Sequence, residues 1–278
     1  MHKLPVVPGH QVVGVVDAIG KGAQGFKEGD RAGVIWLHWT DGQCEYCSRG
    51  LENLCTNARF TGYDVDGGYA EAVSVPAAFA YHVPKKFSDE NAAPLLCAGV
   101  IGYRSLKLSG AARSDRLGLY GFGASAHIVL QIARHMGCEI YVFTRTAAHK
   151  ELALRLGAAW VGDAKDHPPH ELDAAIVFAP AGPVVLDALR ALRKGGTVAL
   201  AGITMTPIPE MDYSLIYHER VVRSAANSTR QDARELLELA AEVPVRTAVT
   251  LYPLEEANRA LADMKHSRIE GAGVLRIG

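Results

Sequence analysis

An alternation of apolar strands and helices begins at Leu117, and this feature restricts the possible folds more than any other. Five apolar runs are predicted to be strands: Leu117–Tyr120, Glu139–Thr144, Ala174–Phe178, Thr197–Ala201 and Val221–Ala225. Helices are expected between them, for example at His149–Leu156 and Pro183–Leu192. Because a strand–helix–strand series packs its helices on both faces of a parallel sheet, the sequence predicts a doubly wound α/β domain.

The segments on either side of this region have a different pattern. Before it, turn residues such as Lys27–Asp30 separate short β-rich runs, and strands are predicted at Val12–Val16, Arg31–Ile35 and Tyr69–Val73. Such runs are typical of a compact antiparallel barrel or sandwich. After it, two helices and an apolar tail are predicted, at Gln231–Ala241, Leu254–Met264 and Gly273–Ile277.

A glycine-rich loop follows the first strand of the α/β region. It has the G-x-G-x-x-A pattern of dinucleotide-binding loops, and the predicted cofactor-binding residues are Gly121, Phe122, Gly123, Ala124, Ser125 and Ala126. Gly121 permits the tight turn, Gly123 lets the backbone approach a pyrophosphate, and Ala126 allows close helix–strand contact. The helix that follows presents free N–H groups to the phosphates. We therefore expect NAD or NADP here; the alternative is a glycine-rich turn that only packs.

The end of the second strand bears on the choice of dinucleotide. A carboxylate at this position would bind the adenosine ribose of NAD, but the chain has Thr144 and Arg145 and no acid nearby. The guanidinium of Arg145 suits the 2′-phosphate of NADP. Two interpretations remain open: Arg145 pairs with that phosphate, or it is a solvated surface residue.

Three cysteines lie close together in a segment rich in turn-forming residues. Cys44, Cys47 and Cys55 have C-x2-C-x7-C spacing, and Asp41 precedes the first of them by three residues. Zinc prefers four tetrahedral ligands, and a carboxylate oxygen binds it at a length close to that of an imidazole nitrogen. The spacing therefore predicts a zinc site of one aspartate and three thiolates. The alternative is a lobe that has lost its metal through Asp41.

This segment resembles the structural-zinc lobe of zinc-dependent alcohol dehydrogenases of the medium-chain dehydrogenase/reductase family, in which all four ligands are usually cysteine. The sequence Pro-Gly-His-Gln at residues 8–11 is similar to the family's Pro-Gly-His-Glu motif, whose histidine binds the catalytic zinc. Ala92–Gly99 is similar to the segment that carries a second ligand of that zinc, at Cys97. The resemblance implies that His10 and Cys97 are catalytic residues and ligands of the catalytic zinc.

The resemblance covers essentially the whole chain and implies its organisation. A GroES-like, β-rich catalytic domain is expected at residues 1–98, with the structural-zinc lobe at about residues 38–58. A Rossmann-like cofactor domain is expected at residues 99–229, and the segment 230–278 is expected to return to the catalytic domain. The implied activity is reversible hydride transfer between a small alcohol or aldehyde and NAD or NADP, with zinc as a Lewis acid.

The resemblance also implies that part of the catalytic domain is missing. In the family another zinc-binding cysteine, with a neighbouring Thr or Ser of the proton relay, lies upstream of the Pro-Gly-His motif, whereas nine residues precede His10. We therefore expect an N-terminally truncated catalytic domain with an incomplete catalytic zinc site. Besides an alcohol dehydrogenase, the chain is then compatible with a nucleotide-binding pseudoenzyme or an inactive fragment. His10, Cys97 and the cysteine lobe argue against a zinc-free quinone-oxidoreductase-like reductase.

Charge and composition restrict the partners. The formal net charge of −1, without a block of like charges, gives no reason to expect nucleic acid or an acidic membrane surface as partner. The longest apolar runs are strand-sized, so no transmembrane helix is predicted. The clustered cysteines suit a reducing compartment, and a cytoplasmic location is expected. By the resemblance, a homodimer or homotetramer is expected, with Thr197–Ala201 and Val221–Ala225 near an interface.

Overall fold

The structure, a computed structural model, describes residues 3–266 and 268–278. The chain divides into two compact units, of which one combines Met1–Val100 with Asn227–Gly278 and the other is Ile101–Ala226. The helix α3 (Ala98–Ser109) contains the boundary between them. None of the helices in the described part of the chain combines the length and the apolar character that crossing a membrane requires.

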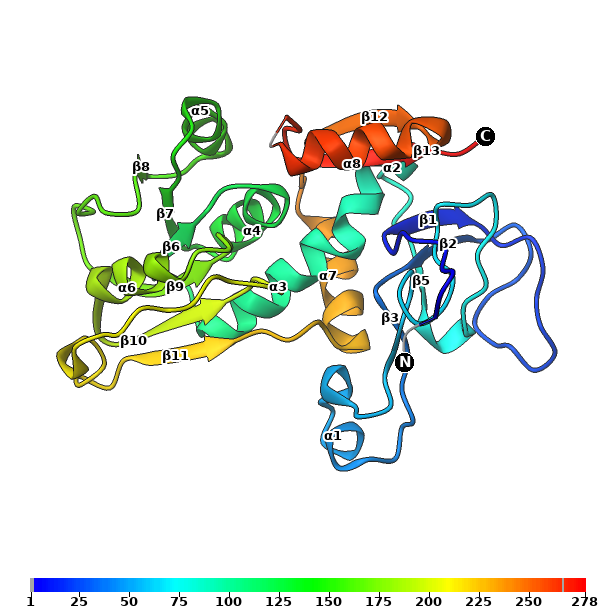
Figure 1. The fold of residues 1–278 in the computed structure, drawn as a ribbon, viewed down its shortest axis with the longest axis horizontal. Coiled ribbons are helices and arrows are strands. Elements are labelled where there is room, and N and C mark those ends of the chain that lie inside the picture. Colours follow the sequence, from blue (N-terminus) through cyan, green and yellow to red (C-terminus); the bar gives the residue numbers. More distant parts are fainter. Residues whose placement is uncertain (1–2, 267) are drawn as a thin grey trace. The chain divides into compact units, whose positions relative to one another are not determined.

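A six-stranded sheet forms the centre of the second unit (Figure 1). Its order is β11-β10-β9-β6-β7-β8, and the strands are β6 (Arg116–Tyr120), β7 (Glu139–Phe143), β8 (Trp160–Gly162), β9 (Leu172–Val177), β10 (Leu192–Leu200) and β11 (Val221–Ser224). All neighbouring strands pair in parallel. The chain proceeds outward in both directions from the β6–β9 pair, which makes this pair the switch point of a doubly wound sheet. The predicted α/β fold and its five predicted strands are confirmed, and the short β8 is an addition.

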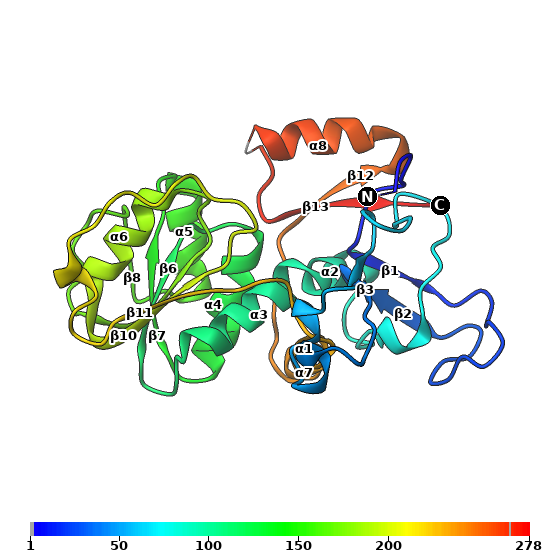
Figure 2. The ribbon, with the colours of Figure 1, turned by 60° about the horizontal axis from the view of Figure 1, so that its bottom comes forward.

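Helices cover both faces of this sheet. The connecting helices are α4 (Ala124–His135), α5 (Ala147–Leu156) and α6 (Gly182–Ala191). Because β6–α4–β7 and β9–α6–β10 advance in opposite directions along the sheet, right-handed connections place α4 and α6 on opposite faces, as Figure 2 shows. On the α6 face, the rings of Tyr120 and Phe143 stack at a centroid distance of 4.0 Å within a fully buried apolar core.

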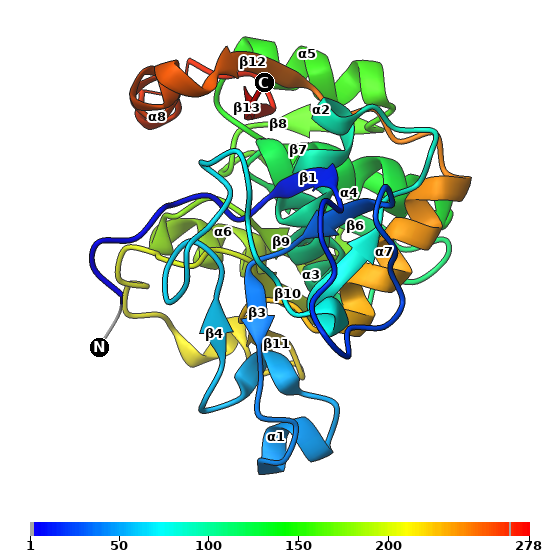
Figure 3. The same ribbon diagram turned by 90° about the vertical axis from the view of Figure 1, so that its right-hand side faces the viewer.

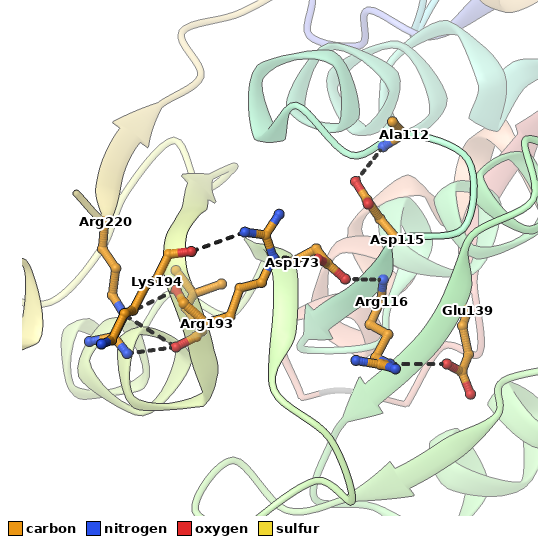
Figure 4. A network of polar contacts seen from close by, with 9 residues as sticks. Ala112, Asp115, Arg116, Glu139, Asp173, Arg193, Lys194 and Arg220 are labelled. Atoms are coloured by element: carbon orange, nitrogen blue, oxygen red, sulfur yellow. Dashed lines mark hydrogen bonds and ion pairs between the residues drawn. The ribbon is translucent and has the colours of Figure 1, made fainter. Parts of the chain in front are cut away.

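Hydrogen bonds and ion pairs of charged side chains connect the amino ends of β6, β7, β9 and β10 (Figure 4). The carboxylate of Asp173 accepts a hydrogen bond from the Arg116 backbone N–H at 2.8 Å and pairs with the guanidinium of Arg193. Arg116 in turn pairs with Glu139, with 3.5 Å between Nε and Oε2. Burial alone would raise the pKa of Asp173, but the Arg116 amide and the Arg193 guanidinium bring this pKa below its ordinary value. Asp173 is therefore a carboxylate whose charge contributes to the stability of the fold.

The first unit consists of small sheets and short helices. Its strands are β1 (Val12–Val15), β2 (Arg31–Val34) and β5 (Ala80–His82) in one antiparallel sheet, β3 (Leu37–Trp39) with β4 (Arg59–Phe60), and β12 (Val249–Pro253) with β13 (Ala272–Arg276). Its α-helices are α1 (Glu45–Ser48), α2 (Asp89–Ala92), α7 (Arg230–Glu242) and α8 (Ala257–Lys265), with 3₁₀ turns η1 (Glu52–Leu54), η2 (Ala77–Phe79), η3 (Ala93–Leu96) and η5 (Leu254–Glu256). Figure 3 shows α1 at the end of the β3–β4 ribbon, away from β1 and β2. The predictions of α7 and α8 are confirmed, except that Leu254–Glu256 forms a 3₁₀ turn.

The prediction of a strand at Tyr69–Val73 is wrong, because this segment forms bends. The N–H groups of Gly67 and Tyr69 donate to the carbonyls of Val7 and Pro8, at 2.7 and 2.9 Å. These bonds place the start of the segment against the residues just before His10, in a crossing arrangement that is not a ladder. This β-rich run thus contacts one irregular segment and does not pair along a strand.

Candidate functional site

The predicted metal lobe brings its four residues together. Asp41, Cys44, Cys47 and Cys55 each offer a ligand atom, and these atoms lie within 4.8 Å of one another. Cys44 precedes α1 and Cys47 lies within it, while Cys55 follows the η1 turn. In a tetrahedral zinc site with Zn–S bonds of about 2.3 Å, neighbouring sulfurs lie about 3.8 Å apart, so only small shifts separate this arrangement from a zinc cage. The residues present therefore fit zinc.

The carboxylate of Asp41 is held in place by three hydrogen bonds. Oδ1 accepts from the backbone N–H groups of Gln43 and Cys44, both at 2.9 Å, and Oδ2 accepts from Nδ2 of Asn57 at 2.8 Å. The Cys44 amide first, then the Gln43 amide and the Asn57 side chain, hold the pKa of Asp41 well below its usual range. Asp41 therefore presents an ionised oxygen to the three sulfurs, and Asn57 is a part of the lobe that the cysteine spacing did not indicate.

His10 and Cys97 meet although 87 positions separate them in the sequence. Nε2 of His10 lies 3.1 Å from Sγ of Cys97. In a tetrahedral zinc site these two atom types lie about 3.6 Å apart, so the pair fits two corners of such a site after a small opening. Burial lowers the pKa of His10 and raises the pKa of Cys97 to about 12. The imidazole is therefore neutral, as a metal ligand must be, and a bound cation would be needed to ionise the thiol.

Glycines fix the backbone that carries His10. Gly9 has a φ of +95°, and a Cβ at Gly67 would lie 1.9 Å from the Gly9 carbonyl oxygen. A Cβ at Gly62 would lie 2.8 Å from the same oxygen. The segments before His10 and after β4 can therefore approach each other only because both positions lack a side chain. The sequence motif located His10, but these supporting glycines emerge only from the structure.

An aromatic group lies beside His10. The ring of Trp36 lies 6.0 Å from the imidazole, measured between centroids, and packs on Phe60 at 4.5 Å. Tyr63 approaches the same indole at 6.5 Å. Trp36 thus places an aromatic ring beside His10, a neighbour that the sequence did not indicate because a single aromatic residue at a bend carries no recognisable pattern.

The glycine-rich loop lies at the switch point of the parallel sheet, directly after β6. Gly121 has a φ of +89°, and a Cβ there would lie 2.9 Å from the backbone nitrogen of Ala179, which follows β9. Gly123 is the N-cap of α4, and a Cβ built on it meets nothing within 4 Å. No side chain of the described residues caps this helix, so its first N–H groups face outward. The two glycines thus have different roles: Gly121 allows the close approach of the loop to Ala179, and Gly123 leaves open space beside the N-terminus of α4.

The remaining loop residues and the end of β7 complete this edge of the sheet. Phe122 and Ala126 are buried, whereas Ala124 and Ser125 are partly exposed at the start of α4. The backbone N–H of Thr144 donates to the carbonyl of Gly162 at 2.8 Å, which extends the β7–β8 pairing by one residue. Arg145 is exposed directly after it. The predicted nucleotide residues therefore occupy neighbouring loops at the carboxyl ends of β6 and β7.

Two family patterns match this chain. Residues 1–85 match the alcohol dehydrogenase GroES-like domain, and residues 126–242 match the zinc-binding dehydrogenase domain. The first match lies within the unit that contains the metal lobe, whereas the second begins in α4 of the α/β unit and continues through α7 of the other unit.

Individual relatives point to the same family. The chain is 52% identical over 283 aligned positions to the probable alcohol dehydrogenase AdhA of Mycobacterium tuberculosis, covering all of this chain and 82% of that one. A cinnamyl alcohol dehydrogenase of Sorghum bicolor has a similar structure, with a TM-score of 0.90, 28% identity, and coverage of 98% of this chain and 82% of that one. The structure of CAD from Helicobacter pylori, complexed with NADP(H), has a TM-score of 0.88 at 26% identity and covers 99% and 83%. The chain therefore belongs to the zinc-binding alcohol dehydrogenases of the medium-chain dehydrogenase/reductase family and is an oxidoreductase.

Proposed function

We propose that this chain is a zinc-dependent alcohol dehydrogenase that transfers a hydride reversibly between a small alcohol or aldehyde and NAD or NADP. The observation that carries the proposal is the approach of His10 Nε2 to Cys97 Sγ at 3.1 Å, from segments far apart in the sequence. A half-buried imidazole and a half-buried thiol offer two ligands to one divalent cation, one fewer than the three protein ligands usual at a catalytic zinc. A zinc-free reductase does not need this pair of residues, and a nucleotide-binding pseudoenzyme that keeps the pair is distinguished by its lack of turnover.

The chemistry at His10 and Cys97 follows from their environment. A zinc ion held by these residues would supply a Lewis acid that lowers the pKa of an alcohol enough for an alkoxide to form near neutral pH. Burial lowers the pKa of His10 and so favours the neutral imidazole that a metal ligand must be. Trp36, which packs on Phe60, places an apolar ring beside His10, and apolar surface next to a reacting oxygen strengthens electrostatic interactions there.

The second unit is proposed to hold the dinucleotide. The N–H groups at the start of α4 bind the pyrophosphate, and Gly121, Phe122, Gly123, Ala124, Ser125 and Ala126 form the loop around it. A bound nicotinamide would accept the hydride from the alcohol or return it to the aldehyde.

We infer that Thr144 and Arg145 approach the adenosine ribose, and that Arg145 pairs with the 2′-phosphate of NADP. Arg145 is exposed, and Val142–Thr146 contains no carboxylate that would repel the phosphate. The NADP(H) in the Helicobacter pylori structure agrees with this inference. An Arg145→Gln variant should lose about tenfold in NADPH affinity, the worth of roughly one charge-assisted contact, and keep its NADH affinity. Equal losses for both nucleotides, or none, would contradict the role of Arg145.

A second, structural zinc is proposed for Asp41, Cys44, Cys47 and Cys55. A zinc ion with four protein ligands has no coordination position left for a substrate, and this distinguishes a structural from a catalytic zinc site. Since all five cysteines are free and four of them serve as proposed metal ligands, a reducing compartment, the cytoplasm, is the proposed location.

We also propose a homodimer or homotetramer that pairs through the second unit. β11 is the last strand of the sheet, its four residues are all exposed, and Val221 and Val222 are 47% and 38% exposed. Tyr213 and Tyr217 add 67% and 62% exposed aromatic side chains from the segment just before it. An open edge with apolar side chains is suited to pairing with the same edge of a second copy.

Zinc content tests the proposed pair of metal sites. The purified 278-residue chain should contain two zinc ions if a substitute ligand completes the site of His10 and Cys97, and then a His10→Ala variant loses one ion and a Cys47→Ser variant the other. The His10→Ala variant should also lose alcohol turnover and keep its affinity for NADPH. A His10→Ala variant that retains all its zinc and its turnover would refute the catalytic assignment. Nucleotide binding without any turnover in the zinc-loaded parent would favour the pseudoenzyme.

A further inference from the structure

The metal lobe is joined to the start of α7 by one ion pair. Glu52 lies in the η1 turn between Cys47 and Cys55, and Arg230 is the first residue of α7. Oε2 of Glu52 accepts from Nη2 and Nε of Arg230 at 2.6 and 2.9 Å. Oε1 accepts from the backbone N–H of Arg230 at 2.7 Å. We name Glu52 and Arg230 the lobe clamp.

The surroundings make the lobe clamp stronger than a surface ion pair. The side chains of Glu52 and Arg230 are 12% and 31% exposed, and the Arg230 guanidinium lies 4.7 Å above the ring of Phe79. The Glu52 carboxylate binds both a guanidinium and a helix N-terminus in a partly desolvated place. It is therefore stabilised by the charge-assisted hydrogen bonds and by the helix dipole.

The helix does not need Glu52 to begin. Thr229 and Asp232 already form a capping box, in which Thr229 Oγ1 accepts from the Asp232 N–H and Asp232 accepts from the Thr229 N–H. The other end of α7 is held separately, because Lys86 Nζ donates to the carbonyls of Ala241 and Val243. The lobe clamp is thus additional to the bonds that define α7, and what it adds is a connection to the lobe.

That connection reaches the metal-binding sulfurs through few bonds. The N–H of Cys55 donates to the carbonyl of Glu52 at 3.0 Å, and the N–H of Gly50 donates to the carbonyl of Cys47 at 3.1 Å. The bonds of Glu52 to Arg230 therefore fix the position of the turn that determines the distance between Cys47 and Cys55. A lobe whose thiols are held at this separation needs less ordering when it binds a metal.

We propose that Glu52 and Arg230 are positioning residues for the structural zinc, and that zinc binding in the lobe and docking of the α7 N-terminus stabilise each other. The proposal rests on the structural zinc proposed above. Because such coupling is reciprocal, breaking the lobe clamp weakens zinc binding, and removing zinc loosens the first turns of α7 by the same free energy.

The test is zinc transfer from the zinc-loaded 278-residue chain to a chromogenic chelator in excess. Arg230→Met keeps an apolar side chain and removes the charge, and Glu52→Gln is close to isosteric. Each should release the lobe zinc about tenfold faster than the parent, within the range of ordinary coupling energies. Lys86→Met is the matched control: it removes a cation from the other end of α7 and should leave the rate unchanged.

Hydrogen exchange provides the reciprocal readout. Zinc removal should accelerate amide exchange in residues 230–236 of the parent, and should do so far less in the Glu52→Gln variant, where the connection is already broken. Parent-like zinc release from folded Glu52→Gln and Arg230→Met variants would overturn the proposal, as would a Lys86→Met variant that accelerates release equally. If Cys47→Ser removes no zinc from the protein, the proposed structural zinc site is wrong. That outcome differs from the two that would overturn the role of Glu52 and Arg230.

Discussion

The two glycines of the nucleotide loop give a prediction in which one variant damages the fold and its neighbour damages only binding. At Gly121, alanine must adopt a φ of +89° and place its Cβ 2.9 Å from the Ala179 nitrogen and 3.2 Å from the Ala179 Cβ. The left-handed backbone costs about 1–2 kcal/mol, and forcing a methyl group into a filled space costs about 1–3 kcal/mol more. Gly121→Ala should therefore lower the free energy of unfolding of the second unit by roughly 2–5 kcal/mol.

At Gly123 the same substitution meets no protein atom. The backbone is extended, with a φ of −117°, and the added Cβ would project into open space. The loss of glycine at an N-cap costs at most about 1 kcal/mol. A pyrophosphate seated on the α4 N-terminus would meet the new methyl group, and a misfit of 1–3 kcal/mol corresponds to a loss of affinity of about 5- to 150-fold.

Thermal unfolding and NADPH titration, carried out on both variants, separate the two effects. We expect Gly121→Ala to lower the Tm by roughly 10 °C, since each kcal/mol shifts the Tm of a domain of this size by a few degrees. Gly123→Ala should have a Tm within a few degrees of the parent and bind NADPH about 5- to 150-fold more weakly. A Gly121→Ala variant as stable as the parent, or a Gly123→Ala variant that binds NADPH as the parent does, would refute the reasoning.

Three further predictions concern charge, metal and assembly. Because the pKa of Asp173 is depressed, its stabilising contribution is present above the ordinary carboxyl pKa of about 4 and is lost as the pH falls through the folded-state value. Asp173→Asn should therefore make the free energy of unfolding depend less steeply on pH below about pH 5. An unchanged pH dependence, measured by urea unfolding, would contradict this. Asn57→Leu removes the side-chain donor to Asp41 and should weaken zinc binding in the lobe by about tenfold, the lower end for a group that orients a metal ligand; parent-like competition with a chelator would rule this out. Val222→Lys places a charge on the exposed β11 edge and should shift the protein to monomers in light scattering, whereas a monomeric parent, or a variant as oligomeric as the parent, would contradict the prediction.

The sequence predicted the fold correctly wherever the periodicity of apolar residues and the turn residues indicate the same element boundaries. All five predicted strands of the parallel sheet are present, and the G-x-G-x-x-A loop marks its switch point. The short elements were missed for a physical reason: β8 and β4 have three and two residues, too few to show a period. β12 ends at Pro253 and pairs in parallel with β13 across the helix between them, an association that depends on tertiary contacts alone.

The candidate site was predictable to the extent that its chemistry is local. The lobe lies within one short segment, so its spacing alone indicated four ligands that meet within 4.8 Å. His10 and Cys97 are distant in sequence, and only the resemblance to a family paired them. The groups proposed to orient the ligands of the lobe, Asn57, Glu52 and Arg230, carry no motif because hydrogen bonds to a ligand or its turn can come from any donor or acceptor that the fold brings close.

The measurement that tests the central claim most directly is alcohol-dependent formation of reduced nicotinamide by the zinc-loaded 278-residue chain, with NADP⁺ and NAD⁺ compared and a Cys97→Ser variant assayed beside the parent. We expect the parent to reduce the nucleotide when a small primary alcohol is added. The Cys97→Ser variant should bind NADPH as tightly as the parent and form no product. A zinc-loaded parent that binds the nucleotide but oxidises no alcohol, or a Cys97→Ser variant as active as the parent, would contradict the assignment of His10 and Cys97 to a catalytic zinc site.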